Sequence, residues 1–155
     1  ISFKDIINDT IESYDYMENA HLLSKEINLE IKCPFYSDQN RLKMIFRNIL
    51  SNAIKYANHY QDNPFIKINI TTDLYKAKIT ISDNGIGIPK MHISNIFDMF
   101  YKANADKKGS GLGLFIVKEA VERLMGNIDV NSVEGEGTTF SLSLPNMLAV
   151  SAVTN

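Results

Sequence analysis

Three groups of residues in this 155-residue chain carry side chains and glycines that suit a ligand containing phosphate. The first is the loop 83–89, which begins with Asp83, and the second is the glycine cluster 109–113. The third is a predicted helix that carries Asn48 and Asn52. An aspartate can accept a hydrogen bond from an amine on a base, glycines let a backbone approach a ligand, and amide oxygens suit a hard cation such as Mg²⁺. No group is specific alone, but in this order they predict one nucleotide pocket.

The polar residues of the predicted helix lie on one stripe. Asn48 and Asn52 are four positions apart, and Lys55 and Tyr56 continue the same face. A solvated face is the ordinary explanation for such a stripe, but asparagines in mid-helix are poor helix formers. We therefore expect Asn52 to ligate magnesium and Asn48 to ligate or orient it. Lys55 would meet a phosphate, and Tyr56 could stack on a base.

The loop 83–89 follows an apolar strand and has two possible roles. In the first, Asp83 is a turn aspartate that local backbone amides satisfy, and Gly85 and Gly87 are turn glycines. In the second, Asp83 lies at the bottom of the pocket and accepts a hydrogen bond from the amine of the base. Gly85 and Gly87 then keep side chains out of the way of the base, and Ile88 belongs to the pocket wall.

The cluster 109–113 precedes a helix, whose N-terminal N–H groups and positive dipole end suit a phosphate. Its members are Gly109, Ser110, Gly111, Leu112 and Gly113. No strand leads directly into the cluster and no βαβ unit surrounds it, so it is not a dinucleotide fingerprint. It also lacks the Gly-Lys-Ser/Thr ending of a P-loop.

A polar segment before the cluster contains three lysines. Lys102 could reach the outer phosphates, and Lys107 and Lys108 are weaker candidates, since lysines in such a segment are often only solvated. The three histidines of the chain show no metal-ligand spacing, and no Ser/His/Asp or Cys/His arrangement is readable.

Composition excludes several classes of protein. The net charge is −2, from 16 basic and 18 acidic residues that are well mixed. Charges mixed in this way provide no basic surface that would bind nucleic acid and no polybasic patch that would bind a membrane surface. Cys33 stands alone, which excludes a disulfide framework and fits a reducing, cytoplasmic compartment.

No apolar run approaches the roughly 20 residues of a membrane helix, so no membrane insertion is expected. The start at Ile1 is no signal peptide and lacks Met, which predicts a fragment of a longer protein.

Hydrophobic periodicity predicts the elements that must position these residues. In chain order they are a helix from a capping box at Ser2 and Asp5 to about residue 21, a strand 27–33, a helix capped by Ser37 or Asp38 and ending near Asn58, a hairpin with arms 66–70 and 77–81, a short helix around 90–100, a polar segment 101–108, a helix from Gly111 to a C-cap at Gly126, and two strands around 128–130 and 140–144 joined by the turn 134–137.

These elements predict an α+β fold, a two-layer sandwich in which three helices cover one face of a mixed, mostly antiparallel sheet. We expect one domain over residues 1–146 and a frayed tail over 147–155.

The motifs together resemble those of the catalytic, ATP-binding domain of sensor histidine kinases in two-component signalling. That domain belongs to a superfamily that also holds DNA gyrase, a heat-shock chaperone and mismatch-repair ATPases. The resemblance extends from about Ser2 to Pro145. The segments that carry it are 47–56 for the N box, 83–89 for the first glycine box, 96–101 for the F box, 109–114 for the second glycine box and 135–140 for the terminal Gly-x-Gly-Thr-x-Phe turn.

The resemblance implies a Bergerat-type sandwich that binds ATP and Mg²⁺ beneath a flexible lid, residues 101–110, which is short for the family. It implies that Asn52 ligates the magnesium and Asp83 meets the adenine amine, and it places Thr138 near the base, through its hydroxyl or a water. Two aromatic residues, Phe97 and Phe100, would anchor the root of the lid.

Asn48 stands where gyrase-like members carry a glutamate that activates water. Because an amide is no general base at neutral pH, hydrolysis should be slow and phosphoryl transfer to a protein histidine is favoured. The resemblance implies that this acceptor lies on a separate dimerising helical hairpin of the same parent protein, with a response regulator as an indirect partner. His21 is not assigned as the acceptor, so the chain alone should not autophosphorylate. The alternatives are an ATP-hydrolysing clamp of the gyrase or chaperone class and a nucleotide-binding regulatory module without kinase activity.

Overall fold

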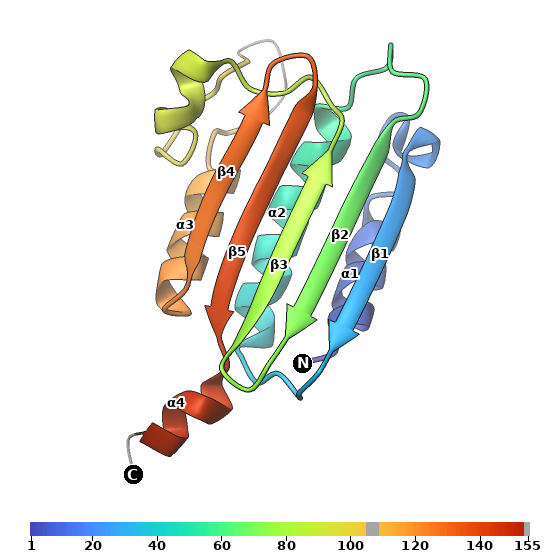
Figure 1. Ribbon diagram of the computed structural model, residues 1–155. Coiled ribbons are helices and arrows are strands. Elements are labelled where there is room, and N and C mark those ends of the chain that lie inside the picture. The colour runs from blue at the N-terminus through green and yellow to red at the C-terminus, as the bar shows by residue number, and fades with distance from the viewer. Residues whose placement is uncertain (105–108, 154–155) are drawn as a thin grey trace.

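Five strands form one sheet in the computed structural model, which describes residues 1–104 and 109–153 (Figure 1). The strands are β1 (Ser24–Ile31), β2 (Phe65–Thr72), β3 (Lys76–Asp83), β4 (Asn127–Val133) and β5 (Gly137–Pro145). Their order in the sheet is β1-β2-β3-β5-β4. β1 runs parallel to β2 and every other neighbouring pair is antiparallel. The sheet is therefore mixed and mostly antiparallel, as predicted.

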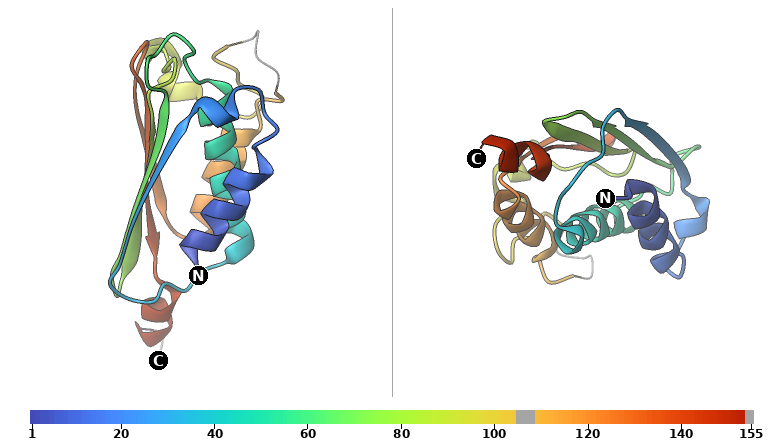
Figure 2. Two further views of the ribbon diagram at one scale, coloured as in Figure 1. Left: turned by 90° about the vertical axis from the view of Figure 1, so that its right-hand side faces the viewer. Right: turned by 90° about the horizontal axis from the view of Figure 1, so that it is seen from below.

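Three long helices lie on the same face of this sheet (Figure 2). They are α1 (Phe3–Ser13), α2 (Gln39–Lys55) and α3 (Gly113–Arg123), and two short 3₁₀ helices, η1 (Ala20–Leu22) and η2 (Lys90–Asn95), lie between the main elements. The seven buried residues of α2 include Ile45, Phe46 and Ile49. They meet the buried alternate positions of the central strands, such as Ile68 and Ile79. The predicted α+β two-layer sandwich is confirmed.

The opposite face of the sheet carries polar side chains. β2, β3 and β5 alternate buried apolar residues with partly or fully exposed ones. Asn69 on β2 hydrogen-bonds Asn28 of β1 at 3.0 Å and Thr80 of β3 at 3.3 Å on that open face. An antiparallel sheet packed on one face and solvated on the other has this pattern. Within residues 1–104 and 109–153, none of the helices is long and apolar enough to cross a membrane.

The first helix is much shorter than its predicted end near residue 21. α1 ends at Ser13, and a series of turns then leads to Asn19, whose φ of 61° is left-handed. Tyr14 and Met17 still pack against the core, but from these turns. Spacings of three and four residues bring side chains to one face both in a helix and in consecutive tight turns, so the periodicity overestimated the helix.

The ends of α2 and α3 also differ in detail from the prediction. Asp38, one of the two predicted caps, begins α2 by accepting a hydrogen bond from the Arg41 N–H at 3.0 Å. α2 ends at Lys55, before the predicted end near Asn58, and α3 begins at Gly113, two residues after the predicted Gly111.

The left-handed residue that ends α3 is Met125, with φ 58°, and not the predicted Gly126. The Met125 N–H donates to the Glu122 carbonyl and the Gly126 N–H to the Val121 carbonyl, both at 2.9 Å, which is a Schellman motif. Gly126 is needed for a different reason, because a Cβ there would lie 2.5 Å from Leu144 Cδ2.

The predicted frayed tail contains a helix in the part that the structure describes, α4 (Met147–Val153). Asn146, which precedes α4, is fully buried and ties three segments together. Its side chain accepts a hydrogen bond from the Tyr36 N–H at 3.1 Å and donates to the Pro34 carbonyl at 2.9 Å, and its N–H donates to the Tyr75 carbonyl at 2.7 Å. The division of the chain into a domain 1–146 and a tail stays a prediction.

Replacing Asn146 by Ala should lower the free energy of unfolding by about 2 kcal/mol, because it removes a fully buried side chain and leaves the Tyr36 N–H and the Pro34 carbonyl, both part-buried, without that partner. Urea unfolding at equilibrium measures the change. The matched control is Asn131→Ala on the solvated end of β4, where Asn131 is exposed and the loss should stay within about 0.5 kcal/mol. Equal losses in both variants would contradict the anchoring role of Asn146.

Candidate functional site

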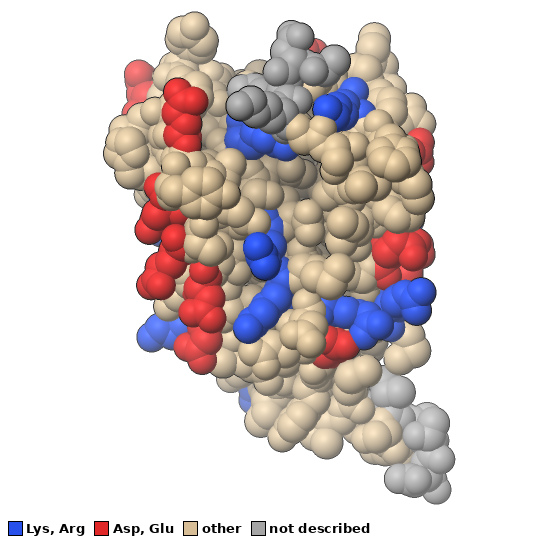
Figure 3. Space-filling model, turned by 180° about the vertical axis from the view of Figure 1, so that it is seen from behind, with Lys and Arg blue, Asp and Glu red and all other residues tan. Residues whose placement is uncertain are grey.

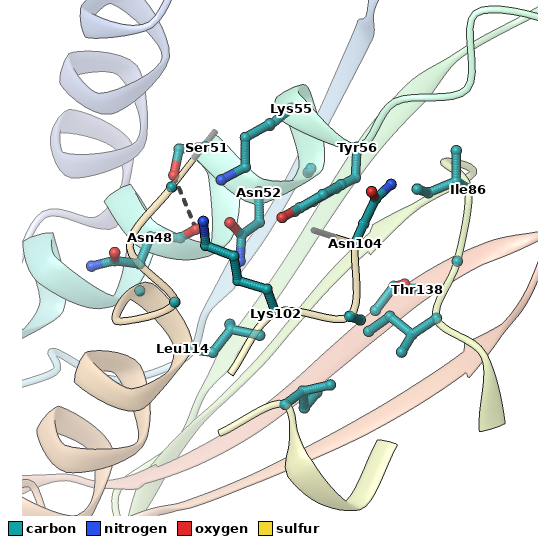
Figure 4. A pocket seen from close by; sticks show the side chains of 18 of the residues that line it. Asn48, Ser51, Asn52, Lys55, Tyr56, Ile86, Lys102, Asn104, Leu114 and Thr138 are labelled. Carbon is teal, nitrogen blue, oxygen red and sulfur yellow. Dashed lines mark hydrogen bonds between the residues drawn. The ribbon is translucent and has the colours of Figure 1, made fainter. Parts of the chain in front are cut away.

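A cavity of about 480 Å³ lies between α2, the loop after β3, the segment that leads into α3, and the start of β5 (Figure 4). Of the residues that the sequence predicts for the pocket and the structure describes, all but two line it. The exceptions are Gly85, which packs behind the wall, and Leu112, which precedes the first residue of α3. Segments far apart in the sequence therefore converge on one pocket.

The end of α2 supplies one wall, with Asn48, Asn52, Lys55 and Tyr56 all facing the cavity. The Asn48 side-chain nitrogen donates to the Met44 carbonyl at 2.7 Å, which fixes the amide and leaves its oxygen for other contacts. That oxygen lies 3.0 Å from the point where a Cβ on Gly113 would stand. The side-chain amide oxygen of Asn48 is therefore oriented toward the start of α3.

Lys55 and Tyr56 occupy the next part of the same wall. The Lys55 ammonium lies 5.0 Å from the centre of the Tyr56 ring, which is within cation–π range. Burial raises the pKa of the Tyr56 hydroxyl above its ordinary value, so the phenol stays neutral. An aromatic face and a cation thus stand side by side, which suits a base next to a phosphate chain.

Asp83 lies at the floor of the cavity, at the end of β3. Its carboxylate accepts a hydrogen bond from the Gly85 N–H at 2.9 Å and another from the Thr138 N–H. Burial raises the pKa of Asp83 to about 6, although both hydrogen bonds act in the opposite direction. Local amides satisfy Asp83, as in the first of the two roles considered, and it also faces the cavity. Its hydrogen bond to the amine of a base stays a prediction.

The two glycines of the loop 83–89 allow close backbone packing. A Cβ on Gly85 would lie 2.5 Å from the Tyr56 carbonyl oxygen. Gly87 has a φ of 67°, and a Cβ there would lie 2.1 Å from the Val133 carbonyl oxygen. The expectation that these glycines keep side chains away from the base is wrong for Gly85, whose missing side chain makes room for the end of α2.

The glycine cluster 109–113 crosses the end of α2 at close range. A Cβ on Gly109 would lie 2.9 Å from Lys55 Nζ. Gly111, with φ 72°, packs on the backbone of Phe100, and its carbonyl accepts the Phe100 N–H at 3.0 Å. This hydrogen bond joins the two ends of the segment 101–110.

The two aromatic residues expected at the root of this segment behave differently. Phe97 packs edge-on against Phe140, with ring centres 6.4 Å apart. Phe100 has a left-handed φ of 63° and its side chain is 65% exposed. Phe97 anchors the root through its ring, whereas Phe100 does so through its backbone.

Lys102 lines the cavity and points across it toward the Asn48 end (Figure 4). Lys107 and Lys108, the two weaker candidates, lie outside the described residues. Ser110 also lines the cavity, as predicted. Three cationic or polar side chains, Lys55, Lys102 and Ser110, thus surround the end opposite Asp83.

The sequence missed several lining residues, among them Tyr101, Asn104 and Glu134. Tyr101 hydrogen-bonds His92 of η2 through its hydroxyl. Tyr101 and Asn104 lie within the expected lid, residues 101–110, but no individual role is predicted for any of the three, because they lie in irregular segments whose course depends on the packing around them. The loop residue Asn84 was also left without a role. It accepts the Phe65 N–H and donates to the Asn63 carbonyl, both at 2.8 Å, and so holds the loop to the start of β2.

The donor set fits a magnesium ion that a ligand's phosphates also hold. Among the described residues, no three His, Cys, Asp or Glu side chains gather as a metal site. The amide oxygens of Asn48 and Asn52 are neutral ligands, and Mg²⁺ usually keeps waters and takes few protein ligands beside phosphates.

The face formed by the helices carries both signs of charge (Figure 3). Exposed acidic residues, including Asp5, Asp9 and Glu12, follow α1. Basic residues, Lys43 and Arg47 among them, follow α2. No single sign dominates this face.

Comparison with known proteins agrees with this geometry. The profile of the histidine kinase-, DNA gyrase B- and HSP90-like ATPase family matches residues 37–147. The chain belongs to this family. The matched residues contain the N box, both glycine boxes and the terminal Gly-x-Gly-Thr-x-Phe turn. An ATP-binding domain of this ATPase family is therefore confirmed.

The relatives of this ATPase domain are sensor kinases. It is 38% identical over 112 residues to sensor histidine kinase WalK of Bacillus subtilis, covering 70% of this chain and 18% of the relative. It is 40% identical over 114 residues to sensor protein SrrB of Staphylococcus aureus, covering 70% of this chain and 19% of the relative. The chain therefore spans about a fifth of the length of these relatives and corresponds to their catalytic ATP-binding part.

Solved structures share the fold of this ATPase domain. The mycobacterial sensor histidine kinase MprB matches with a TM-score of 0.72 at 24% identity, over 94% of this chain and 95% of that one. The catalytic domain of the histidine kinase ThkA matches with a TM-score of 0.72 at 23% identity, over 94% and 93% of the two chains.

Replacing Asp83 by Asn should stabilise the fold at neutral pH. Because the folded-state pKa is raised to about 6, ionisation of Asp83 destabilises the folded state increasingly as pH rises from about 4 to 6. The variant should exceed the parent in free energy of unfolding by roughly 2–3 kcal/mol at pH 7, and the gap should close by pH 4. Urea unfolding across this pH range measures it, and a gap that does not change with pH would contradict the buried charge.

Proposed function

We propose that this chain binds ATP with magnesium and delivers the γ-phosphoryl group to a histidine on a separate dimerising helical hairpin of the same parent protein. A response regulator would then take the phosphoryl group from that histidine. The chain would act in the cytosol, whatever anchors its parent. The observation that carries the proposal is that Asp83 and the α2 wall with Asn52 and Lys55 line one cavity.

The base end of the cavity would hold adenine. The carboxylate of Asp83 accepts from the 6-amine of adenine, beside Thr138, while the Tyr56 ring offers a stacking surface. An ionised carboxylate is purely an acceptor and accepts more strongly than a protonated carboxyl group, and at pH 7 a group with a pKa of about 6 is mostly ionised. Affinity for the base should therefore fall as pH drops through this value.

The opposite end would hold the phosphates. Lys55 and Lys102 neutralise their charge, and the N-terminus of α3 at Gly113 presents backbone N–H groups with a positive dipole end. The amide oxygens of Asn52 and Asn48 would hold the magnesium ion, which neutralises charge on the phosphate oxygens. Positioning and charge neutralisation are the usual contribution of a protein to phosphoryl transfer.

The nucleophile must come from the acceptor. Asn48 occupies the place of a water-activating base, and its amide nitrogen already donates to Met44, so it accepts no proton. An imidazole nitrogen of the acceptor would form the bond to the γ-phosphorus as the bond to ADP breaks. This favours transfer over the alternative of an ATP-hydrolysing clamp. The complete set of Asp83, Asn52 and glycines argues against a regulatory module without kinase activity.

Replacing Asp83 by Ala should weaken ATP binding by roughly 1.5–3 kcal/mol, because a charge-assisted hydrogen bond in a buried site is lost. Calorimetric titration of the 155-residue chain measures it. Asp129→Ala on the exposed edge strand β4 is the matched control and should leave affinity unchanged. Equal affinity of the Asp83 variant and the parent would refute the assignment of the base end.

Replacing Asn52 by Ala should abolish magnesium-dependent transfer while leaving adenosine binding intact, since adenosine carries no phosphate for the metal. Transfer is measured with labelled ATP and a supplied helical hairpin that carries the acceptor histidine. Asn131→Ala controls for loss of an exposed asparagine. An unchanged rate of transfer in the Asn52 variant would exclude it as a magnesium ligand.

A further inference from the structure

Ser132, on β4, belongs to no motif in the sequence, yet its hydroxyl joins three segments behind the floor of the cavity. It accepts a hydrogen bond from the Ile88 N–H at 2.8 Å and donates one to the Gly137 carbonyl at 2.9 Å. It also lies 2.8 Å from the Thr138 hydroxyl, at hydrogen-bond distance. Thr138 lines the cavity, whereas Ser132 does not (Figure 4).

The number of hydrogens decides the direction of the bond between the two hydroxyls. A serine hydroxyl has one hydrogen and two acceptor sites. If that hydrogen goes to the Gly137 carbonyl, the Ile88 N–H occupies one acceptor site of Ser132 and the Thr138 hydroxyl can donate to the other. If Ser132 donates to Thr138 instead, the Gly137 carbonyl loses its bond. Thr138 is only 8% exposed, and lost hydrogen bonds at buried groups are costly. The arrangement that makes all three bonds therefore turns the Thr138 hydrogen toward Ser132.

This direction determines what Thr138 offers to the cavity. With its hydrogen engaged by Ser132, the Thr138 hydroxyl presents only lone pairs. Asp83 is paired with Thr138 across β3 and β5, and its carboxylate also only accepts. Asp83 and Thr138 then both present acceptors to the cavity, and neither of these two side chains offers a donor.

We propose that Ser132 is a positioning residue that fixes the polarity of the Thr138 hydroxyl, so that the floor selects a base with an amine and rejects one with a carbonyl at the same place. The inference rests on the proposed ATP binding and adds the residue that supports its selectivity.

Neighbouring contacts hold Ser132 in place. The Gly135 N–H donates to the Ile86 carbonyl at 2.7 Å, and Gly87 packs without a side chain against the Val133 carbonyl. The turn after Ser132 is therefore held against the loop 83–89. Turning the Ser132 hydroxyl away from Thr138 would also break its bonds to the Ile88 N–H and the Gly137 carbonyl.

The test compares ATP with inosine triphosphate, which has the same phosphates and a carbonyl in place of the amine. Calorimetry on the 155-residue chain gives the dissociation constant of each. The ratio of the inosine to the ATP constant should fall about tenfold in Ser132→Ala, because the released Thr138 hydroxyl can rotate and donate to the carbonyl. Ser132→Thr keeps a hydroxyl and should keep the ratio. Ser141→Ala, at an exposed position of β5, is the matched control.

The outcomes separate this inference from the proposed function. A parent chain that binds no ATP contradicts the proposed function. A parent that prefers ATP, with the same ratio in Ser132→Ala, overturns the role of Ser132 alone. An equal loss of affinity for both nucleotides means that Ser132 is only structural and overturns it too. If circular dichroism shows that Ser132→Ala does not fold, Ser132→Cys, whose thiol is a weak hydrogen-bonding group, should lower the ratio in the same direction.

Discussion

Direct contact between backbone segments at the floor of the cavity is the constraint on which the site depends. The loop 83–89 is held between the end of α2 and the turn that joins β4 to β5. The Ile86 N–H donates to the Tyr56 carbonyl at 3.0 Å on one side, and on the other the Ile86 carbonyl accepts the Gly135 N–H at 2.7 Å. A Cβ on Gly137 would lie 2.0 Å from the Asp83 carbonyl oxygen. No side chain fits between these segments, so the direction of the Asp83 carboxylate is fixed by the backbone around it.

A carboxylate placed in this way is unfavourable for the empty protein. Burial raises the pKa of Asp83, and two backbone N–H groups offset only part of that effect. An amine on a bound base would donate to the same carboxylate and stabilise its ionised form. Under the proposed function, the fold would accept a local loss of stability where it gains affinity for the base, a common relation between stability and function.

The sequence predicted the layers, the sheet and most of the cavity because these follow from short-range patterns. Alternation at Ile66, Ile68 and Ile70 identified a half-buried strand, and the asparagine stripe of α2 identified a wall of the pocket. Every element expected from these patterns is present, with ends displaced by a few residues. The exception is α1, where turns after Ser13 keep a helical spacing of apolar side chains without a helix.

What the sequence could not predict depends on contacts between distant segments. Ser132 is ordinary in a strand, and its importance appears only when Ile88 and Thr138 come within hydrogen-bond distance. Asn146 looked like an ordinary last residue before a tail, but Tyr36, 110 positions away, bonds to its side chain. The sequence predicts a C-cap at Gly126, because glycine favours the left-handed conformation. Met125 adopts that conformation instead, and the packing of Gly126 on Leu144 is not visible in the sequence.

In the proposed function, the fixed amide of Asn48 would decide between hydrolysis and transfer. Its nitrogen is bound to the Met44 carbonyl, so its oxygen is oriented toward Gly113, whose lack of a side chain leaves room for it. This oxygen can hold a cation but cannot remove a proton from water at neutral pH. A carboxylate in the same place could do both. Under the proposed function, the amide would leave the chain able to orient a nucleotide and unable to supply the nucleophile, so that the reaction would depend on an acceptor that brings its own. Consumption of the nucleotide would then be coupled to the position of that acceptor.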